Sequence, residues 1–199
     1  MKILVIGANG TVGKAVVAEL AQRHEVIEAS QSRGPHRIDV LDSGSIRGLF
    51  AEIGKVDAIV TTTGRLHFGP LAETTPEQFR IGLDDKLMGQ VKVVLAAHPF
   101  VTDGGSFTLT SGILDIEPVR HGANATTVNA AIAGFVRAAA VELPRGLRIN
   151  AVSPTVLTES LDKFGPYFRG FESAPASRVA LAYSRSVEGV QTGRVYRVG

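Results

Sequence analysis

A glycine-rich loop near the start of the chain has the spacing needed to bind a phosphate group. It reads Gly7-Ala8-Asn9-Gly10-Thr11-Val12-Gly13 and follows a short apolar run at residues 3–6. Free N–H groups and the positive end of the helix dipole attract a dinucleotide pyrophosphate to a helix N-terminus. Glycines leave room for the tight turn and for close approach of the ligand. Because the loop lies between an expected strand and an expected helix, we favour nucleotide binding over a plain turn.

The residues at the end of the second expected strand bear on which nucleotide is bound. NAD sites usually place an acidic residue there, which accepts hydrogen bonds from the ribose hydroxyls. Ser30 stands at that position and Arg33 follows, and a hydroxyl with a guanidinium suits the 2′-phosphate of NADP. Two alternatives stay open: Glu28 as the ribose acid, and Arg33 as an ordinary exposed loop residue. The sequence favours NADP over NAD.

These residues need a sheet to position them, and the hydrophobic pattern predicts one. Strand-like runs occur at residues 2–6, 25–29, 56–61, 105–110, 148–152 and 194–198, with a further short run at 37–39. Helical patterns lie between them, at 11–23, 43–53, 76–97, 123–142 and 175–186. Strands that are apolar on both faces and alternate with helices indicate a parallel sheet. We expect a single doubly wound, Rossmann-type α/β domain over residues 1–199, with helices on both faces.

Composition and charge exclude several classes of protein. The 199 residues include no cysteine, which excludes disulfides, thiolate metal sites and cysteine nucleophiles. No two histidines have metal-ligand spacing, so no metal is expected. The net charge of +2 comes without a basic run, which argues against nucleic-acid binding. No apolar run approaches the ~20 residues of a membrane span, and no signal peptide is recognisable, so we expect a cytoplasmic protein that does not enter membranes.

Several segments, in order along the chain, resemble the short-chain dehydrogenase/reductase superfamily. They are Asp39-Val40, Thr61-Thr62-Thr63-Gly64, residues 105–111 ending in Ser111, residues 148–154, Thr158 and Thr192-Gly193. The resemblance covers nearly the whole chain and implies an oxidoreductase that binds a nicotinamide nucleotide. To the glycine loop, Ser30 and Arg33 it adds the expected cofactor-binding residues Asp39, Val40, Thr62, Thr63, Gly64, Pro154, Val156 and Thr158. Among these, Asp39-Val40 resembles the pair that contacts the adenine, and Thr158 matches the threonine that holds the nicotinamide carboxamide.

The same resemblance implies that most of the usual catalytic residues are missing. The family carries a Tyr-x-x-x-Lys pair on one helix, and those positions hold Ala125 and Asn129 here. An earlier helix normally supplies an asparagine, and Lys86 stands in its place. Of the four usual catalytic residues, only Ser111 remains. The chain resembles a group of atypical family members that lack these residues and have no determined function.

The missing tyrosine is the proton donor of this family, and a lysine is our candidate to replace it. Positioned proton transfer contributes typically ~10²–10⁴-fold, so its loss alone leaves a slow enzyme rather than none. We expect a catalytic set of Ser111, Lys86 and Asn129, in which Lys86 and Asn129 have exchanged places and the ammonium lies near the cofactor ribose. The alternative for Lys86 is a solvated side chain on a helix surface.

Aromatic residues in the segment 157–171 suggest a cover over a pocket. Phe164, Tyr167, Phe168 and Phe171 recur at helical spacing and predict an apolar lid, which hints at a hydrophobic small-molecule substrate. As a further alternative, Tyr167 swings its hydroxyl into the site. Two functions remain open: an NADP(H)-dependent oxidoreductase, and a non-catalytic NADP(H)-binding sensor or scaffold.

The helical pattern at 123–141 is unusually poor in charge. Arg137 is its only charged residue, and six alanines surround Ile132, Phe135 and Val136. A helix with one buried face normally carries charges on the other. We therefore expect this helix to be covered on most sides, with a homodimer or homotetramer built on it and on the helix at 76–97.

Overall fold

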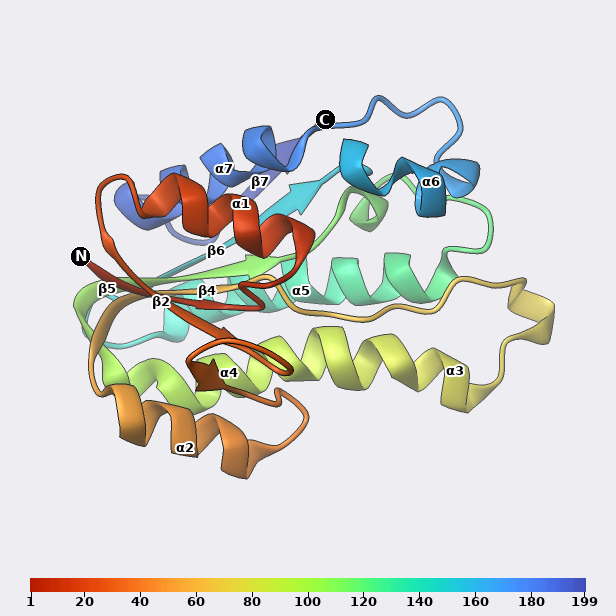
Figure 1. Ribbon diagram of the computed structural model, residues 1–199. Helices are drawn as coiled ribbons and strands as arrows, with labels where there is room; N and C mark the ends of the chain where they lie inside the picture. Colours follow the sequence, from red (N-terminus) through yellow and green to blue (C-terminus); the bar gives the residue numbers. More distant parts are fainter.

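The computed structural model describes residues 1–199 and contains one parallel sheet between two layers of helices (Figure 1). The seven strands are β1 (Lys2–Ile6), β2 (Glu25–Ser30), β3 (His36–Arg37), β4 (Val56–Thr61), β5 (Val101–Thr110), β6 (Arg148–Pro154) and β7 (Val195–Val198). The helices are α1 (Thr11–Leu20), α2 (Ser43–Ile53), α3 (Pro76–Ile81), α4 (Gly89–Ala97), α5 (Ala123–Glu142), α6 (Leu161–Phe164) and α7 (Ala176–Glu188). The predicted doubly wound α/β fold is confirmed.

The order of the strands explains where a ligand can bind. The sheet runs β3-β2-β1-β4-β5-β6-β7, and every neighbouring pair is parallel. The chain therefore leaves β1 in one direction and returns at β4 in the other. In open α/β sheets, ligands bind outside the carboxyl ends of the strands at this switch point.

Two apolar cores lie on the two faces of the sheet, and β1 contributes to both. Ile3 and Val5 face α1 and α7, whereas Leu4 and Ile6 face the layer that contains α2, α4 and α5. This alternation is the period of two that a strand imposes on its side chains. It explains why the strand reads as a continuous apolar run in the sequence.

The residues predicted as one helix at 76–97 contain a change of helical geometry. Between α3 and α4, residues Gly82–Met88 form a π-helical stretch. The Gly89 N–H marks its end, since it is shared between the carbonyls of Asp84 and Asp85. π-helical turns widen a helix by one residue and occur often at functional sites. The hydrophobic period cannot show such an insertion, so the sequence predicted a regular helix.

The helix α5 is buried on one side only within the protomer. Asn129, Ile132 and Val136 lie on the buried face, whereas Ala138 and Val141 are exposed. A single chain therefore covers one side of this helix, and the expected cover of its other side would have to come from a second copy. Whether a second copy covers the exposed face stays a prediction. No helix of the fold has the length and apolar character required to cross a bilayer.

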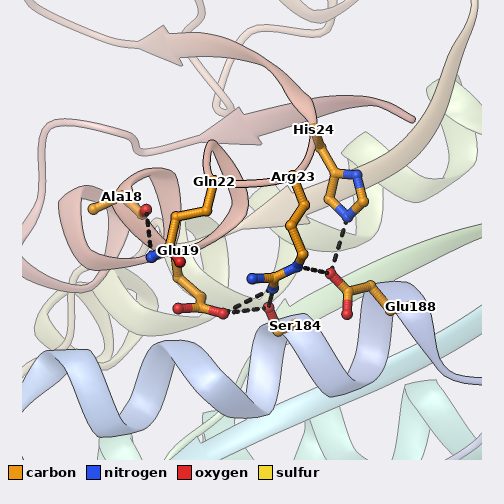
Figure 2. Close-up of polar contacts among 7 residues, drawn as sticks. All are labelled: Ala18, Glu19, Gln22, Arg23, His24, Ser184 and Glu188. Carbon is orange, nitrogen blue, oxygen red and sulfur yellow. Dashed lines mark hydrogen bonds and ion pairs between the residues drawn. The ribbon is translucent and has the colours of Figure 1, made fainter.

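Polar contacts fasten the carboxyl end of α1 to α7 (Figure 2). Arg23 pairs with Glu19 at 2.8 Å and with Glu188 at 3.0 Å, and it donates to Ser184 Oγ at 2.9 Å. His24 contacts the same Glu188 carboxylate at 2.9 Å. These contacts hold the two helices side by side over the face of β1 that carries Ile3 and Val5.

Candidate functional site

The glycine-rich loop forms a tight turn from β1 into α1, and two of its glycines are required by the protein itself. Gly7 adopts a φ of 88°, in the left-handed region that favours glycine. A side chain at Gly13 would place its Cβ 2.1 Å from the Gly7 carbonyl oxygen. Close packing of the helix on the turn therefore excludes any larger residue at Gly13.

The amino end of α1 is free to receive an anion. Gly10 precedes the helix and provides no side-chain cap, and no acidic residue lies in the first turn. A Cβ at Gly10 would have the Gly7 oxygen as its nearest neighbour, at 3.4 Å, so little of the protein itself crowds this position. The unpaired N–H groups of the first turn and the helix dipole together favour a phosphate here.

A cavity of about 250 Å³ lies at the switch point of the sheet, and we call it the Gly10 cavity. Its lining consists of Gly7, Gly10, Ser30, Gln31, Ile38, Asp39, Val40, Thr62, Thr63, Gly64, Arg65 and Asp85. Most of these were predicted to bind cofactor. Gln31, Ile38, Arg65 and Asp85 were missed, although Arg65 directly follows a predicted residue. The predicted residues Asn9, Thr11, Gly13 and Arg33 do not line this cavity.

Asn9 and Ser30 shape the Gly10 cavity by holding the turn that follows β2. Asn9 Nδ2 donates to Ser30 Oγ at 2.7 Å and to the Arg33 carbonyl at 3.0 Å. The Ser30 hydroxyl in turn donates to the Arg33 carbonyl. These bonds hold the turn after β2, and Arg33 is exposed at its end. Glu28 is exposed in the middle of β2 and does not line the cavity.

One buried hydroxyl in the Gly10 cavity lacks a partner. Thr63 Oγ1 is inaccessible to solvent and makes no hydrogen bond within the chain. A buried polar atom without a partner is costly, and such atoms call for an explanation. With the free helix end and the open position at Gly10, the unpaired hydroxyl fits a polar ligand such as a dinucleotide.

A second cavity of about 260 Å³ adjoins the first at Gly64, and we call it the Ser111 cavity. It brings together Ser111, Lys86 and Asn129, the expected catalytic set. The predicted cofactor residues Val12, Pro154 and Val156 also line it. Thr158 does not, and its hydroxyl contacts Ser173 Oγ at 3.1 Å. The apolar part of the lining is formed by Leu66, Phe68, Ile113, Leu114, Leu157, Phe164 and Phe168.

Lys86 is buried beside Ser111 and Asn129. Its Nζ donates to Asn129 Oδ1 at 2.7 Å and to the Ser111 carbonyl at 2.8 Å. The Ser111 hydroxyl donates to the Asn129 carbonyl at 2.9 Å, which joins the three residues in one network. Only 7% of Lys86 is exposed, so the alternative of a solvated lysine is wrong. An ammonium has three N–H donors, and two are engaged here.

The neutral form of the Lys86 amine is more favourable at this buried position than it is in water. Its partners are a carbonyl and an amide oxygen, and no carboxylate pairs with it. Burial lowers the pKa of Lys86 from 10.5 to about 8, because the charged form loses its hydration. The group can therefore lose and regain a proton near neutral pH.

Gly64 makes room for the stem of the lysine. The residue has a φ of 146°, and a Cβ built on it would lie 2.3 Å from Lys86 Cγ. Gly64 thus serves both cavities. It borders the Gly10 cavity, and its lack of a side chain lets the stem of Lys86 pass into the Ser111 cavity.

Aromatic side chains cover the Ser111 cavity, with one member that the sequence did not predict. Phe164 and Phe168 line the cavity, as does Phe68 from the loop after β4. The Phe68 ring lies 5.6 Å from that of Phe164 and 5.0 Å from that of Tyr167. Tyr167 packs on Phe68 and does not line the cavity, which leaves it outside the polar network.

Nearly the whole chain matches one known protein family. A family model described as Enoyl-(Acyl carrier protein) reductase matches residues 2–196. The chain belongs to the short-chain dehydrogenase/reductase superfamily. Ala125, which we predicted to stand at the position of the family's tyrosine, is fully buried and packs with Ile113 and Leu114.

Solved and curated relatives support this membership. The protein lin1944 from Listeria innocua is 47% identical, with all of both chains matched and a TM-score of 0.98. A small-chain dehydrogenase solved in complex with NADPH is 26% identical, covers 100% of this chain and 96% of its own, and has a TM-score of 0.89. Hydroxynaphthalene reductase arp2 of Aspergillus fumigatus is 30% identical over 175 residues, which are 76% of this chain. The match spans 64% of the length of that reductase.

Proposed function

We propose that the protein is an NADP(H)-dependent oxidoreductase whose proton donor is Lys86. The observation that carries the proposal is the buried ammonium of Lys86, which shares the Ser111 cavity with Ser111 and Asn129. Two of its N–H donors are fixed by the chain, and the third is available to a substrate oxygen. The apolar lining and the aromatic cover suit a hydrophobic small molecule that carries a carbonyl or hydroxyl group.

Phosphate chemistry supports NADP over NAD. Ser30 lines the Gly10 cavity, and Arg33 lies on the turn that Ser30 and Asn9 hold. A guanidinium binds phosphate oxygens in a fork, so Arg33 suits the extra phosphate of NADP. The solved relative with bound NADPH agrees with this choice.

The chain supplies orientation and a proton in the proposed reaction. Bound NADPH supplies the hydride that reduces a carbonyl carbon. Lys86 donates a hydrogen bond to the carbonyl oxygen and passes its proton as negative charge develops there. The neutral amine stays bonded to Asn129 Oδ1, which prevents it from swinging away. Its pKa of about 8 allows it to regain a proton from water in the cavity near neutral pH.

Binding and turnover test this proposal separately. NADPH should raise the melting temperature more than NADH does, and a screen of apolar aldehydes, ketones and alcohols should reveal turnover. Activity should fall at least tenfold in Lys86→Met and fall in Ser111→Ala. Lys55→Met, which changes an exposed lysine before β4, is the matched control and should behave as the native protein. Nucleotide binding without any turnover would favour the non-catalytic sensor or scaffold.

The exposed apolar face of α5 supports a homodimer or homotetramer. Val141 is 85% exposed, and Leu95 on α4 is 62% exposed. Gly134 has no atom within 4 Å of the place where a Cβ would stand, so a second backbone has room to approach. Burying such residues between two copies removes apolar surface from water.

A further inference from the structure

The side chain of Gln90 joins three parts of the fold at the floor of the site. It is fully buried in the first turn of α4. Its Oε1 accepts from Thr61 Oγ1 at 2.6 Å and from the Thr110 N–H at 2.8 Å. Its Nε2 donates to the Thr110 carbonyl at 2.9 Å and to the Lys86 carbonyl at 3.0 Å. Every donor and acceptor group of the amide is engaged, as a buried polar side chain requires.

These four bonds meet the backbone where it enters the two cavities. Thr61 and Thr110 are the last residues of β4 and β5. The next residues along the chain are Thr62, which lines the Gly10 cavity, and Ser111, which lines the Ser111 cavity. Gln90 thus fixes the carboxyl ends of two central strands to the helix that carries Lys86.

The bond from Gln90 Nε2 to the Lys86 carbonyl lies where the helix changes its geometry. Lys86 lies in the π-helical stretch, whose end is marked by the shared Gly89 N–H. The Gln90 amide holds the carbonyl of Lys86, and the Ser111 carbonyl accepts from its Nζ. Both ends of the lysine are therefore tied to the end of β5, one through Thr110 and Gln90 and the other directly through Ser111.

We propose that Gln90 is a positioning residue, which holds the π-helical turn against β4 and β5 so that the Lys86 ammonium stays inside the Ser111 cavity. The inference rests on the proposed function only for the use of that ammonium in catalysis. The placement of Lys86 itself is open to direct measurement. Without the Gln90 bonds, the Lys86 carbonyl loses its link to Thr110, and only the bond from Lys86 Nζ to the Ser111 carbonyl still ties the lysine to the end of β5, so the lysine moves toward water.

A matched variant separates positioning from general support of the core. Tyr183 is also fully buried, and its hydroxyl contacts Thr110 Oγ1 at 2.6 Å from the α7 side of the sheet. Tyr183→Phe therefore removes a buried hydrogen bond at the same strand end without touching Lys86. Gln90→Met keeps the length of the side chain and removes all four bonds. If Gln90 only stabilises the core, the two variants should differ from the native protein in stability alone.

The experiment is a proton titration of the Lys86 amine, monitored by NMR of protein that carries ¹³Cε-labelled lysine, with the Lys86 signal assigned from Lys86→Met. In the native protein the amine should titrate near pH 8. In Gln90→Met its pKa should rise toward the ordinary lysine value, because the amine regains hydration, and in Tyr183→Phe it should not change. An unchanged Lys86 titration in Gln90→Met would overturn the proposal.

Turnover and a milder variant complete the test. With a substrate in hand, Gln90→Met should lower kcat at least tenfold and leave the NADPH affinity within about threefold. If the native protein shows no turnover, the proposed function fails while the titration still decides the role of Gln90. Should Gln90→Met not fold, Thr61→Val removes only the hydroxyl that donates to Gln90 Oε1. A raised Lys86 pKa in that variant supports the proposal, and an unchanged one contradicts it.

Discussion

Replacing Lys86 by methionine should flatten the dependence of stability on pH. The folded protein holds the lysine pKa at about 8, against 10.5 for the free side chain. Between these values the unfolded chain binds more protons than the folded one, so the free energy of unfolding rises with pH. At about 1.4 kcal/mol for each pH unit between the two pKa values, the gain from pH 7 to pH 10 is on the order of 2–3 kcal/mol. Lys86→Met lacks this gain.

Urea unfolding followed by circular dichroism, at intervals from pH 7 to pH 10, measures the effect. The absolute stability of the variant is a poor guide, because it also leaves Asn129 Oδ1 and the Ser111 carbonyl without their donor, at about 1–3 kcal/mol each. That cost does not depend on pH, so the slope isolates the lysine. Lys55→Met should keep the native slope. Parallel pH profiles for the native protein and Lys86→Met would refute the buried, low-pKa lysine.

Other changes test the nucleotide site and the assembly. Arg33→Ala should weaken NADPH binding about tenfold and leave NADH binding unchanged in calorimetric titration, with Arg47→Ala as control; equal effects on both nucleotides would remove the 2′-phosphate role. Gly10→Glu should abolish the thermal shift caused by NADPH, because a carboxylate at the free end of α1 repels the pyrophosphate. Gly13→Ala should lower stability by ~1–3 kcal/mol in urea unfolding, since its Cβ would overlap the Gly7 oxygen. Light scattering at tens of micromolar should show a dimer or tetramer, and Val141→Glu should shift the population toward monomer; a native monomer at that concentration contradicts the assembly.

The glycine-rich turn could be predicted because its shape depends on residues that lie close together in the sequence. A turn that needs a left-handed φ at Gly7 and no side chain at Gly13 leaves a pattern of glycines that can be read directly. Strands buried on both faces leave continuous apolar runs, so the boundaries of β1 and β4 were predicted to the residue. The order of such segments then predicts the fold.

The rest depends on contacts between distant residues, which leave no local pattern. Lys86 and Asn129 are 43 positions apart, and only the family resemblance suggested that they meet. The π-helical stretch is invisible because its side chains still follow a helical period. Gln90 reads as an ordinary polar residue on a helix, since nothing in the sequence shows that its helix turns this side chain toward the ends of β4 and β5. Phe68 was missed because a loop aromatic has no period at all.

The fastening of α1 to α7 has a consequence for how the protein is made. The contacts of Glu19 with Ser184 and of Arg23 with Glu188 join residues that are 165 positions apart. Contacts of such separation carry a large loop-closure entropy and slow the search for the native topology. During synthesis, the face of β1 that packs against α1 and the apolar side of α1 stay uncovered until α7 has left the ribosome. We therefore expect α1, whose amino end is the proposed phosphate site, to be fixed in place only once α7 is present, so that a nucleotide stabilises the chain that includes α7 rather than guiding its first half into shape.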